Sequence, residues 1–196
     1  MSNCIIYLIG FSGSGKFTIA KELCKAIYAV QVSNTVFNDL IFNFVNLQNS
    51  IVPDDVWEQI FEVRKNVVRV LEKYYIKSKH YIFTNELLEG DTYDQRVYNL
   101  AVNLSKKINT QIFPVVLHCS HDELIKRIKL KSARNKNRNL VTDPNFTIKR
   151  IQEKKLLIPK DAFEIDNSTL SVKETVSKII EEVKNRKLTV AFIDKA

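Results

Sequence analysis

A short glycine-rich segment near the start of the chain carries the residue types that bind phosphate. Gly10, Gly13 and Gly15 are followed by Lys16, with an apolar run before them and a helical pattern after them. A helix N-terminus offers unpaired backbone N–H groups and a positive potential, and glycines let the backbone close around an anion. The segment therefore predicts a phosphate-binding loop between a strand and a helix. The alternative is a glycine turn without a ligand.

The spacing Gly10-x-x-x-x-Gly15-Lys16 resembles the Walker A loop of P-loop NTPases, and it lies in the strand-to-helix context of that family. The resemblance implies that ATP binds through backbone N–H groups of the loop and that Lys16 takes part in catalysis. The loop residues to which it assigns nucleotide contacts are Gly10, Ser12, Gly13, Ser14, Gly15, Lys16, Phe17 and Thr18.

One position departs from the family pattern. In the family, the residue after the lysine is a Ser or Thr that holds Mg²⁺, and here it is Phe17. The hydroxyl has moved to Thr18, and a turn of about 100° per helical residue points it away from the metal. We therefore expect a weakened or atypical Mg²⁺ site, and nucleotide binding is better supported than catalysis.

The second strand is predicted over Val30–Phe37, and it ends at Asn38 and Asp39. Residues at the carboxyl ends of parallel strands face the ligand crevice. We therefore expect Asn38 to contact a substrate, and Asp39 to accept the proton of an acceptor hydroxyl or to hold Mg²⁺ through water. The alternative is that Asp39 caps a helix over Leu40–Leu47.

A long helical pattern runs from Pro53 to about Lys77, after a first helix at about Thr18–Ala29. A long helix at this place resembles the acceptor-binding insertion of small P-loop kinases, which implies such a region over residues 40–78. Arg64 interrupts its apolar face and is a candidate for reaching an anionic group, and Asn43 is a candidate substrate contact. The aromatic residues of this helix are expected to be core.

A third strand over His80–Thr84 is followed by Asn85 and Glu86. In many P-loop proteins the strand carrying the Walker B acid ends at such a place, but here no Asp is present. Asn85 and Glu86 are predicted substrate contacts, and Glu86 is also a candidate for orienting water or metal. The alternative for Glu86 is a solvated loop acid.

The rest of the chain alternates helices and strands. Capping residues and apolar spacing predict helices that begin at Asp91, Ser120, Pro144 and Ser171, the third ending at Ile158, and strands over Gln111–His118 and Ala162–Ile165. Five strands alternating with helices predict an α/β, three-layer fold with a mainly parallel sheet. Residues 1–196 are expected to form one P-loop kinase-like domain.

The positive charge is densest between Lys126 and Arg138, which holds four Lys, three Arg and no acid. The kinase resemblance implies a lid over residues 127–145 whose arginines close over the phosphates. It assigns a catalytic role to Arg134 and nucleotide contacts to Arg127 and Arg138, and the planar fork of arginine suits phosphate oxygens. The alternative is a solvated basic loop.

Composition restricts the class of protein. A chain of 196 residues with 45% hydrophobic content can bury a sizeable core, and its net charge of +8 is compatible with polyanionic nucleotides. Three cysteines without a framework spacing indicate a reducing, cytoplasmic location, and no apolar stretch approaches the ~20 residues of a membrane helix. Nucleic acid is an unlikely partner, because the basic residues are not interleaved with aromatics.

The layout resembles the small-molecule kinase branch of the P-loop superfamily, which contains shikimate, gluconate, nucleoside and nucleotide kinases, and also the AAA-type predicted kinases. The resemblance implies an enzyme that uses ATP and Mg²⁺ to phosphorylate a small hydroxylated or phosphorylated metabolite. One alternative is a nucleotide-binding regulator or degenerate kinase that has lost turnover through Phe17, and another is a nucleic-acid-associated protein.

Overall fold

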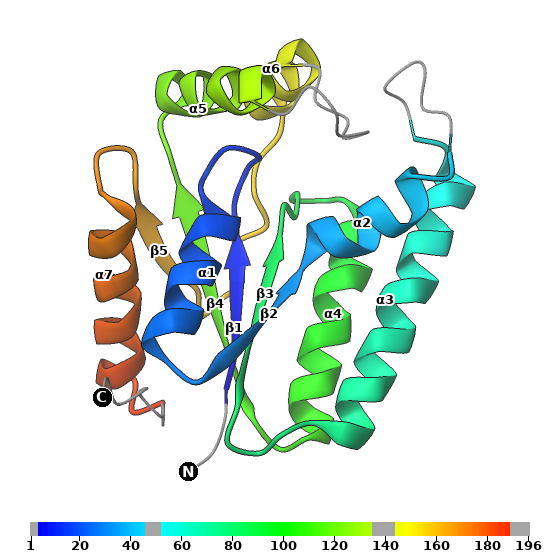
Figure 1. The fold of residues 1–196 in the computed structure, drawn as a ribbon, viewed down its shortest axis with the longest axis vertical. Coiled ribbons are helices and arrows are strands. Elements are labelled where there is room, and N and C mark those ends of the chain that lie inside the picture. The colour runs from blue at the N-terminus through cyan, green and yellow to red at the C-terminus, as the bar shows by residue number, and fades with distance from the viewer. Residues whose placement is uncertain (1–3, 46–51, 135–143, 189–196) are drawn as a thin grey trace.

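A five-stranded parallel sheet forms the centre of the computed structural model, which describes residues 4–45, 52–134 and 144–188 (Figure 1). Every neighbouring pair of strands is parallel, in the order β2-β3-β1-β4-β5. The strands are β1 (Cys4–Ile9), β2 (Ala29–Ser33), β3 (His80–Asn85), β4 (Gln111–His118) and β5 (Phe163–Asp166). The predicted α/β class with five strands is confirmed, and all the carboxyl ends of the strands meet at one edge.

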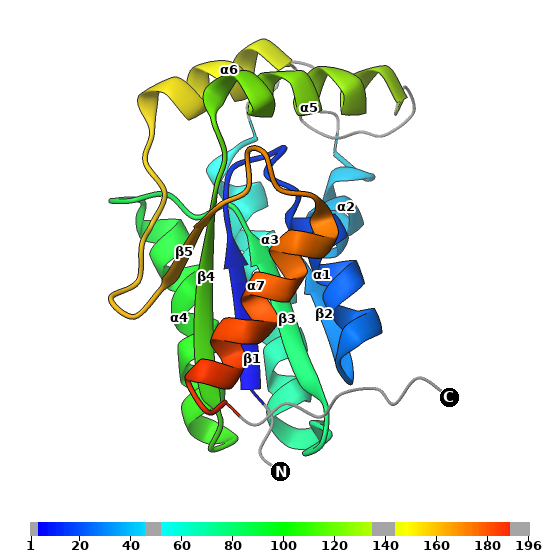
Figure 2. The same ribbon diagram turned by 90° about the vertical axis from the view of Figure 1, so that its left-hand side faces the viewer.

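Helices cover both faces of the sheet, because the central strand β1 is buried on both sides. Ile6 and Leu8 pack with helices α1 (Lys16–Ala26) and α7 (Val172–Asn185). The alternate residues Ile5, Tyr7 and Ile9 pack with α3 (Asp54–Tyr74) and α4 (Thr92–Lys107). The period-2 alternation of β1 thus produces the three layers seen in Figures 1 and 2.

A pair of helices lies across the carboxyl edge of the sheet (Figure 2). These are α5 (His121–Arg134) and α6 (Pro144–Glu153). Leu124 and Ile128 of α5 and Ile151 of α6 form a small separate core, against which Phe11 of the glycine loop packs. The helix pair is therefore held directly against the loop that follows β1.

The prediction of a strand over Val30–Phe37 is wrong beyond its first half. β2 ends at Ser33, and Asn34–Phe42 forms the helix α2. Phe37 and Phe42 of α2 face Ile60 of α3 in a common apolar cluster. Packing of these two side chains against α3 has therefore outweighed the strand preference of the β-branched residues in this segment.

Other boundaries differ from the prediction by a few residues. The first helix begins at Lys16 and ends at Ala26, because Tyr28 already leads into β2. α6 ends at Glu153 rather than Ile158, because the chain after it runs beside the segment that follows β3: Leu156 forms an antiparallel bridge with Leu88. Residues 46–51, which include the end of the helix predicted over Leu40–Leu47, and the apolar tail 189–196 lie outside the described residues.

Capping chemistry explains three helix starts. The Asp91 carboxylate accepts a hydrogen bond from the Asp94 N–H at 3.0 Å, and Ser171 and Glu174 form both bonds of a capping box. At α5 only half of the predicted box is present. The Glu123 N–H donates to Ser120 Oγ at 3.4 Å, but the Glu123 carboxylate binds Arg127 instead.

Across the described ranges, no helix combines the length and the apolar character needed to cross a membrane.

Candidate functional site

The glycine loop after β1 has the backbone conformation that only glycine adopts easily. Gly13 and Gly15 have φ values of +89° and +91°. A Cβ placed on Gly13 would lie 3.1 Å from Ile128 Cγ1 of α5, so this loop is also tightly packed. The loop ends directly at the first turn of α1, whose N–H groups have positive potential. This is the geometry in which a backbone surrounds an anion.

Lys16 folds back over the loop. Its Nζ donates to the carbonyl oxygens of Gly10 at 2.6 Å and Phe11 at 2.9 Å. Both carbonyls precede the tight turn that the glycines make. The ammonium group therefore lies across the mouth of the loop, where it adds positive charge to the backbone N–H groups.

Phe17 does not pack into the core. Its side chain is 55% exposed, and Thr18 beside it is exposed as well. Within residues 4–45, 52–134 and 144–188, no three His, Cys, Asp or Glu side chains are placed together to hold a metal ion. The loop thus fits a phosphate group, but the position that follows its lysine supplies no oxygen for Mg²⁺.

Asn85 connects this loop to the second part of the site. Its backbone carbonyl accepts from the Gly10 N–H at 3.2 Å, and its side-chain Nδ2 donates to the Tyr7 hydroxyl at 2.6 Å. Burial raises the pKa of Tyr7 well above its usual range, so the phenol stays neutral and can accept this bond. The end of β3 is therefore fixed against the first residue of the loop.

Two predicted substrate contacts, Asn38 and Asn85, lie around the buried Arg64, which was itself predicted. The Arg64 guanidinium donates to Asn38 Oδ1 at 2.7 Å, to Asn85 Oδ1 at 3.3 Å, and to Asn34 Oδ1. Arg64 is 5% exposed and lies over the Phe37 ring. Sequence reasoning named Asn38, Arg64 and Asn85, but it missed Asn34, because Asn34 was assigned to the interior of a strand.

The three asparagine oxygens that accept hydrogen bonds from Arg64 are neutral, and the charge of Asp94 acts on the guanidinium without an ion pair. No carboxylate of the described residues forms an ion pair with it, and its Nε has no hydrogen-bond partner there. Burial lowers the pKa of Arg64, an effect that the phenols of Tyr93 and Tyr7 partly offset. A cavity of about 20 Å³, lined in part by Arg64, Phe37 and Asn85, borders the group. A buried cation without a directly bound counter-ion is costly, so this cluster favours an incoming anion.

Asn38 and Asp39 are placed differently from the prediction, because both lie in α2. Asp39 lies inside α2 rather than at the end of a strand, and it is half-buried. Asn43 is the exposed residue that ends α2. The expected placement of Asp39 at the carboxyl end of β2 is wrong, because the chain turns into a helix at Asn34, five residues earlier.

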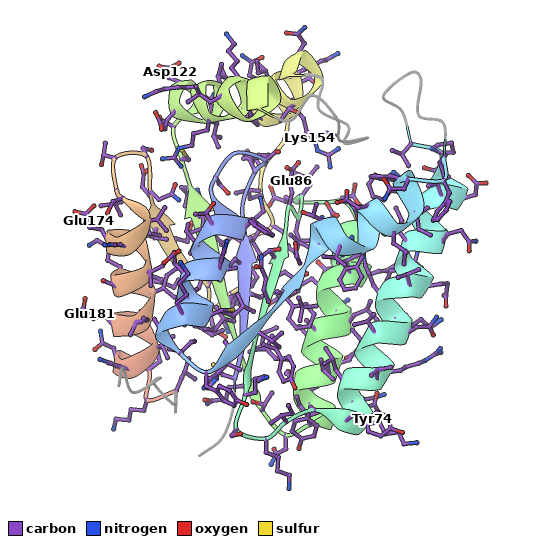
Figure 3. The ribbon with its side chains drawn as sticks, viewed as in Figure 1. Tyr74, Glu86, Asp122, Lys154, Glu174 and Glu181 are labelled. Atoms are coloured by element: carbon purple, nitrogen blue, oxygen red, sulfur yellow. The ribbon has the colours of Figure 1, made fainter. Side chains whose placement is uncertain are left out.

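Glu86 joins the glycine loop to the helix pair above it (Figure 3). Its Oε2 accepts from the Ser12 N–H at 2.8 Å, and its Oε1 accepts from Arg150 Nε at 2.7 Å. Glu86 is thus not a solvated loop acid. Sequence reasoning missed Arg150, because it follows Lys149 on a helix where no spacing distinguishes it from surface charge.

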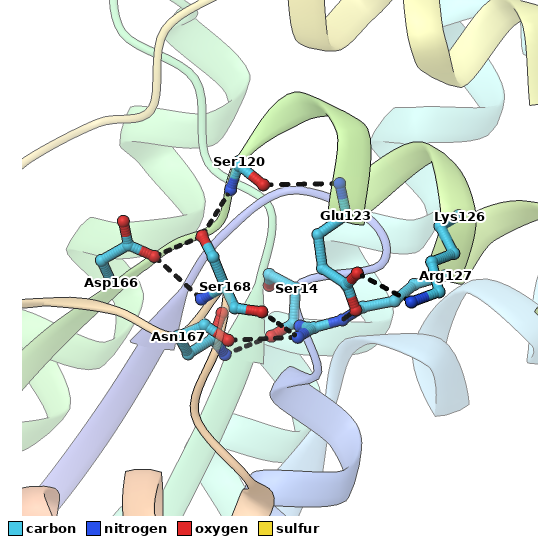
Figure 4. A network of polar contacts seen from close by, with 8 residues as sticks. All are labelled: Ser14, Ser120, Glu123, Lys126, Arg127, Asp166, Asn167 and Ser168. Carbon is cyan, nitrogen blue, oxygen red and sulfur yellow. Dashed lines mark hydrogen bonds and ion pairs between the residues drawn. The ribbon is translucent and has the colours of Figure 1, made fainter.

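A polar network links the loop after β5 to α5 and to the glycine loop (Figure 4). Asn167 Nδ2 donates to the Ser14 carbonyl at 2.8 Å. Arg127 donates to Glu123 Oε1 at 2.8 Å and to the Asn167 carbonyl at 3.1 Å. Arg127 therefore lies beside the loop, but its guanidinium is bound to protein. Asn167 was missed, although its position directly after a parallel strand is the signal that identifies such residues.

The structure does not describe the side chains of the other two predicted lid arginines, Arg134 and Arg138. Arg134 is the last residue of α5, and its side chain is not among those described. Arg138 falls in 135–143, outside the described residues. Their predicted contacts with phosphate stay predictions.

One carboxyl beside this site gives a pH-dependent prediction. Burial raises the pKa of Asp94 from 3.8 to about 6, with the Leu88 N–H opposing the shift and Asp91 adding to it. Because the folded pKa exceeds the unfolded one, the Asp94 carboxylate destabilises the fold increasingly as pH rises through this interval. We expect Asp94→Asn to raise the free energy of unfolding by about 2 kcal/mol more at about pH 7.5 than at about pH 4.5. Urea unfolding measures this difference, and an equal effect at both pH values would contradict it.

No protein-family model matches the chain, and no curated protein matches it. Solved structures of kinases share its fold. A sugar kinase from Janibacter has a TM-score of 0.59 at 12% identity, with 94% of this chain and 95% of that chain covered. A gluconokinase from Sinorhizobium meliloti has a TM-score of 0.52 at 14% identity, with 94% of this chain and 97% of that chain covered. A thymidylate kinase from Candida albicans has a TM-score of 0.56 at 13% identity, with 98% of both chains covered. The chain has the fold of P-loop small-molecule kinases.

Proposed function

We propose that this protein is a P-loop kinase that transfers the γ-phosphoryl group of ATP to a small hydroxylated or phosphorylated metabolite. The observation that carries the proposal is the glycine loop itself. Its left-handed Gly13 and Gly15, its lysine and the following helix N-terminus lie together at the carboxyl edge of the sheet. Phosphoryl transfer depends on positioning and charge neutralisation, and such a loop supplies both.

The loop residues have separable tasks in this proposal. The N–H groups of Gly13, Ser14 and Gly15 hold the β-phosphate, and Lys16 leaves the Gly10 and Phe11 carbonyls to bind the β- and γ-phosphates. Arg134, with Arg127 or Arg138, neutralises charge as the phosphoryl group moves. Mg²⁺ normally neutralises part of the triphosphate charge, but Phe17 lacks the side-chain oxygen that would hold the ion at its usual position.

The acceptor side is the Arg64 cluster, made by Arg64 with Asn34, Asn38 and Asn85. It is joined to the glycine loop through the Asn85 carbonyl and the Gly10 N–H. A buried guanidinium with an unpaired Nε supports an acceptor that carries a phosphate or carboxylate group. Asp39, next to Asn38 on α2, is the carboxylate that we propose accepts the proton of the acceptor hydroxyl.

Turnover tests the function directly. ATP consumption is measured over a panel of hydroxylated metabolites in which each neutral compound has a phosphorylated or carboxylated counterpart. We expect consumption with an anionic acceptor and loss of that activity in Arg64→Met. Tight ATP binding without turnover on any acceptor would instead favour a nucleotide-binding regulator, the function that exposed Phe17 suggests.

Phe17 provides a specific prediction. Phe17→Ser restores the hydroxyl that the Walker A loop places on Mg²⁺, and the wild-type side chain is 55% exposed, so its removal costs little packing. We expect Mg·ATP affinity or turnover to rise about tenfold, since one oxygen ligand is added to the ion. Calorimetry and a coupled assay measure the two quantities. If both fall, Phe17 has a positive role of its own.

A further inference from the structure

We propose that Glu86 is an internal ligand of the glycine loop, and that Arg150 is the arginine that ATP takes over from it. The inference rests on the proposed function, because it assigns regulation to the same loop. It concerns a chain of three groups, the Ser12 N–H, the Glu86 carboxylate and the Arg150 guanidinium, which we call the Glu86 bridge. The bridge accounts for a pair of residues that the nucleotide contacts described above do not use.

The two bonds of the bridge use different oxygens of one carboxylate. Glu86 Oε2 accepts from the Ser12 N–H at 2.8 Å and Oε1 accepts from Arg150 Nε at 2.7 Å. The Glu86 side chain is 19% exposed and that of Arg150 is 38% exposed. The carboxylate is therefore held between the loop and α6, with both oxygens engaged.

A carboxylate in this position has the chemistry of a phosphate group. Both anions accept from backbone N–H groups and from arginine, in short charge-assisted hydrogen bonds. Ser12 lies within the loop, two residues after Gly10. An incoming phosphate that bound the Ser12 N–H would displace Glu86. The Arg150 guanidinium would then lie close enough to bind the phosphate, because the Ser12 N–H and the guanidinium now bind the same carboxylate.

The surrounding backbone keeps Arg150 close to this place. The chain after α6 is paired with the chain after β3: the Glu89 N–H donates to the Lys155 carbonyl at 2.9 Å, and the Leu157 N–H donates to the Leu87 carbonyl at 2.9 Å. Arg150 lies near this anchored end of α6. Its transfer from Glu86 to a phosphate therefore needs a change of side chain rather than a movement of the helix.

Charge makes the exchange directional. While the bridge is closed, a negative carboxylate lies at the mouth of a loop that binds an anion, and it holds a cation that the anion would use. Removing the Glu86 charge should thus favour ATP, and removing the Arg150 charge should disfavour it. A bridge that only ties α6 to β3 would give another pattern, in which both variants weaken ATP binding and stability together.

The experiment compares Glu86→Gln, Arg150→Ala and wild type by calorimetry with ATP and with inorganic tripolyphosphate. We expect Glu86→Gln to bind both ligands about fivefold more tightly, because one competing charge-assisted bond is removed. Arg150→Ala should bind them about tenfold more weakly, because one arginine contact is lost. The matched control is Glu58→Gln, which removes a similar carboxylate from an exposed pair with Arg96 and should leave affinity unchanged.

Hydrogen exchange without nucleotide provides an independent readout. In Glu86→Gln we expect faster exchange in the loop 10–16 and in α6, while Glu58→Gln exchanges there as wild type does. If wild type binds ATP but Glu86→Gln binds it with equal or lower affinity, the proposed role of the bridge is overturned and the proposed function is not. Failure of wild type and Glu86→Gln alike to bind either ligand would overturn the bridge and the proposed function together.

Discussion

Replacing Lys16 with methionine is expected to weaken ATP binding about 100-fold, since charge-assisted hydrogen bonds of one ammonium group are lost. The wild-type Nζ already lies across the loop, on the Gly10 and Phe11 carbonyls. Methionine keeps the apolar stem but cannot donate. Calorimetric titration of the purified variant with ATP measures the change.

The matched control is Lys25→Met on the same helix. Lys25 is exposed and pairs with Glu22 near the end of α1, away from the loop. The Lys25→Met variant should bind ATP as wild type does, and its free energy of unfolding should change by less than about 0.5 kcal/mol. A Lys16→Met affinity within threefold of wild type would remove the lysine from the nucleotide site.

Gly13→Ala is the second substitution with a large expected effect. Gly13 has a φ of +89°, and an added Cβ would lie 3.1 Å from Ile128 Cγ1 and 3.3 Å from the Leu124 carbonyl. Backbone strain and the crowding of α5 act together, so we expect the free energy of unfolding to fall by about 3 kcal/mol. ATP binding should be lost as well, because the loop must shift. Urea unfolding and calorimetry check the two effects.

Gly90→Ala separates strain from crowding. Gly90 has a φ of +74°, but a Cβ there would have no atom within 4 Å. We expect a loss of about 1 kcal/mol and unchanged ATP binding. If Gly13→Ala cost no more than Gly90→Ala, the close packing of the loop against α5 would be disproved.

The sequence predicted the elements whose signals are local. The apolar run of β1, the glycine loop and the caps at Asp91 and Ser171 depend on neighbouring residues, and all are present in the structure. The α2 segment was mispredicted because Val30–Phe37 is β-branched by composition. Its helical form depends on packing against Ile60 of α3, which is distant in sequence.

The same distinction between local signals and contacts distant in sequence applies to the site. The glycine loop was predicted because its spacing is contiguous, and Arg64 was singled out because it interrupts an apolar face. Arg150 could not be found, since its importance comes from a contact with Glu86 that is 64 positions away. No local pattern records such a pairing, and only the fold brings the two side chains together.

Calorimetric titration of the unaltered protein with ATP and with GTP, each with and without Mg²⁺, tests the central claim that the glycine loop binds the phosphates of a nucleoside triphosphate. Because Phe17 replaces the usual metal ligand, we expect saturable binding of a triphosphate that depends only weakly on Mg²⁺. Heat no greater than that of dilution in all four titrations would contradict the claim.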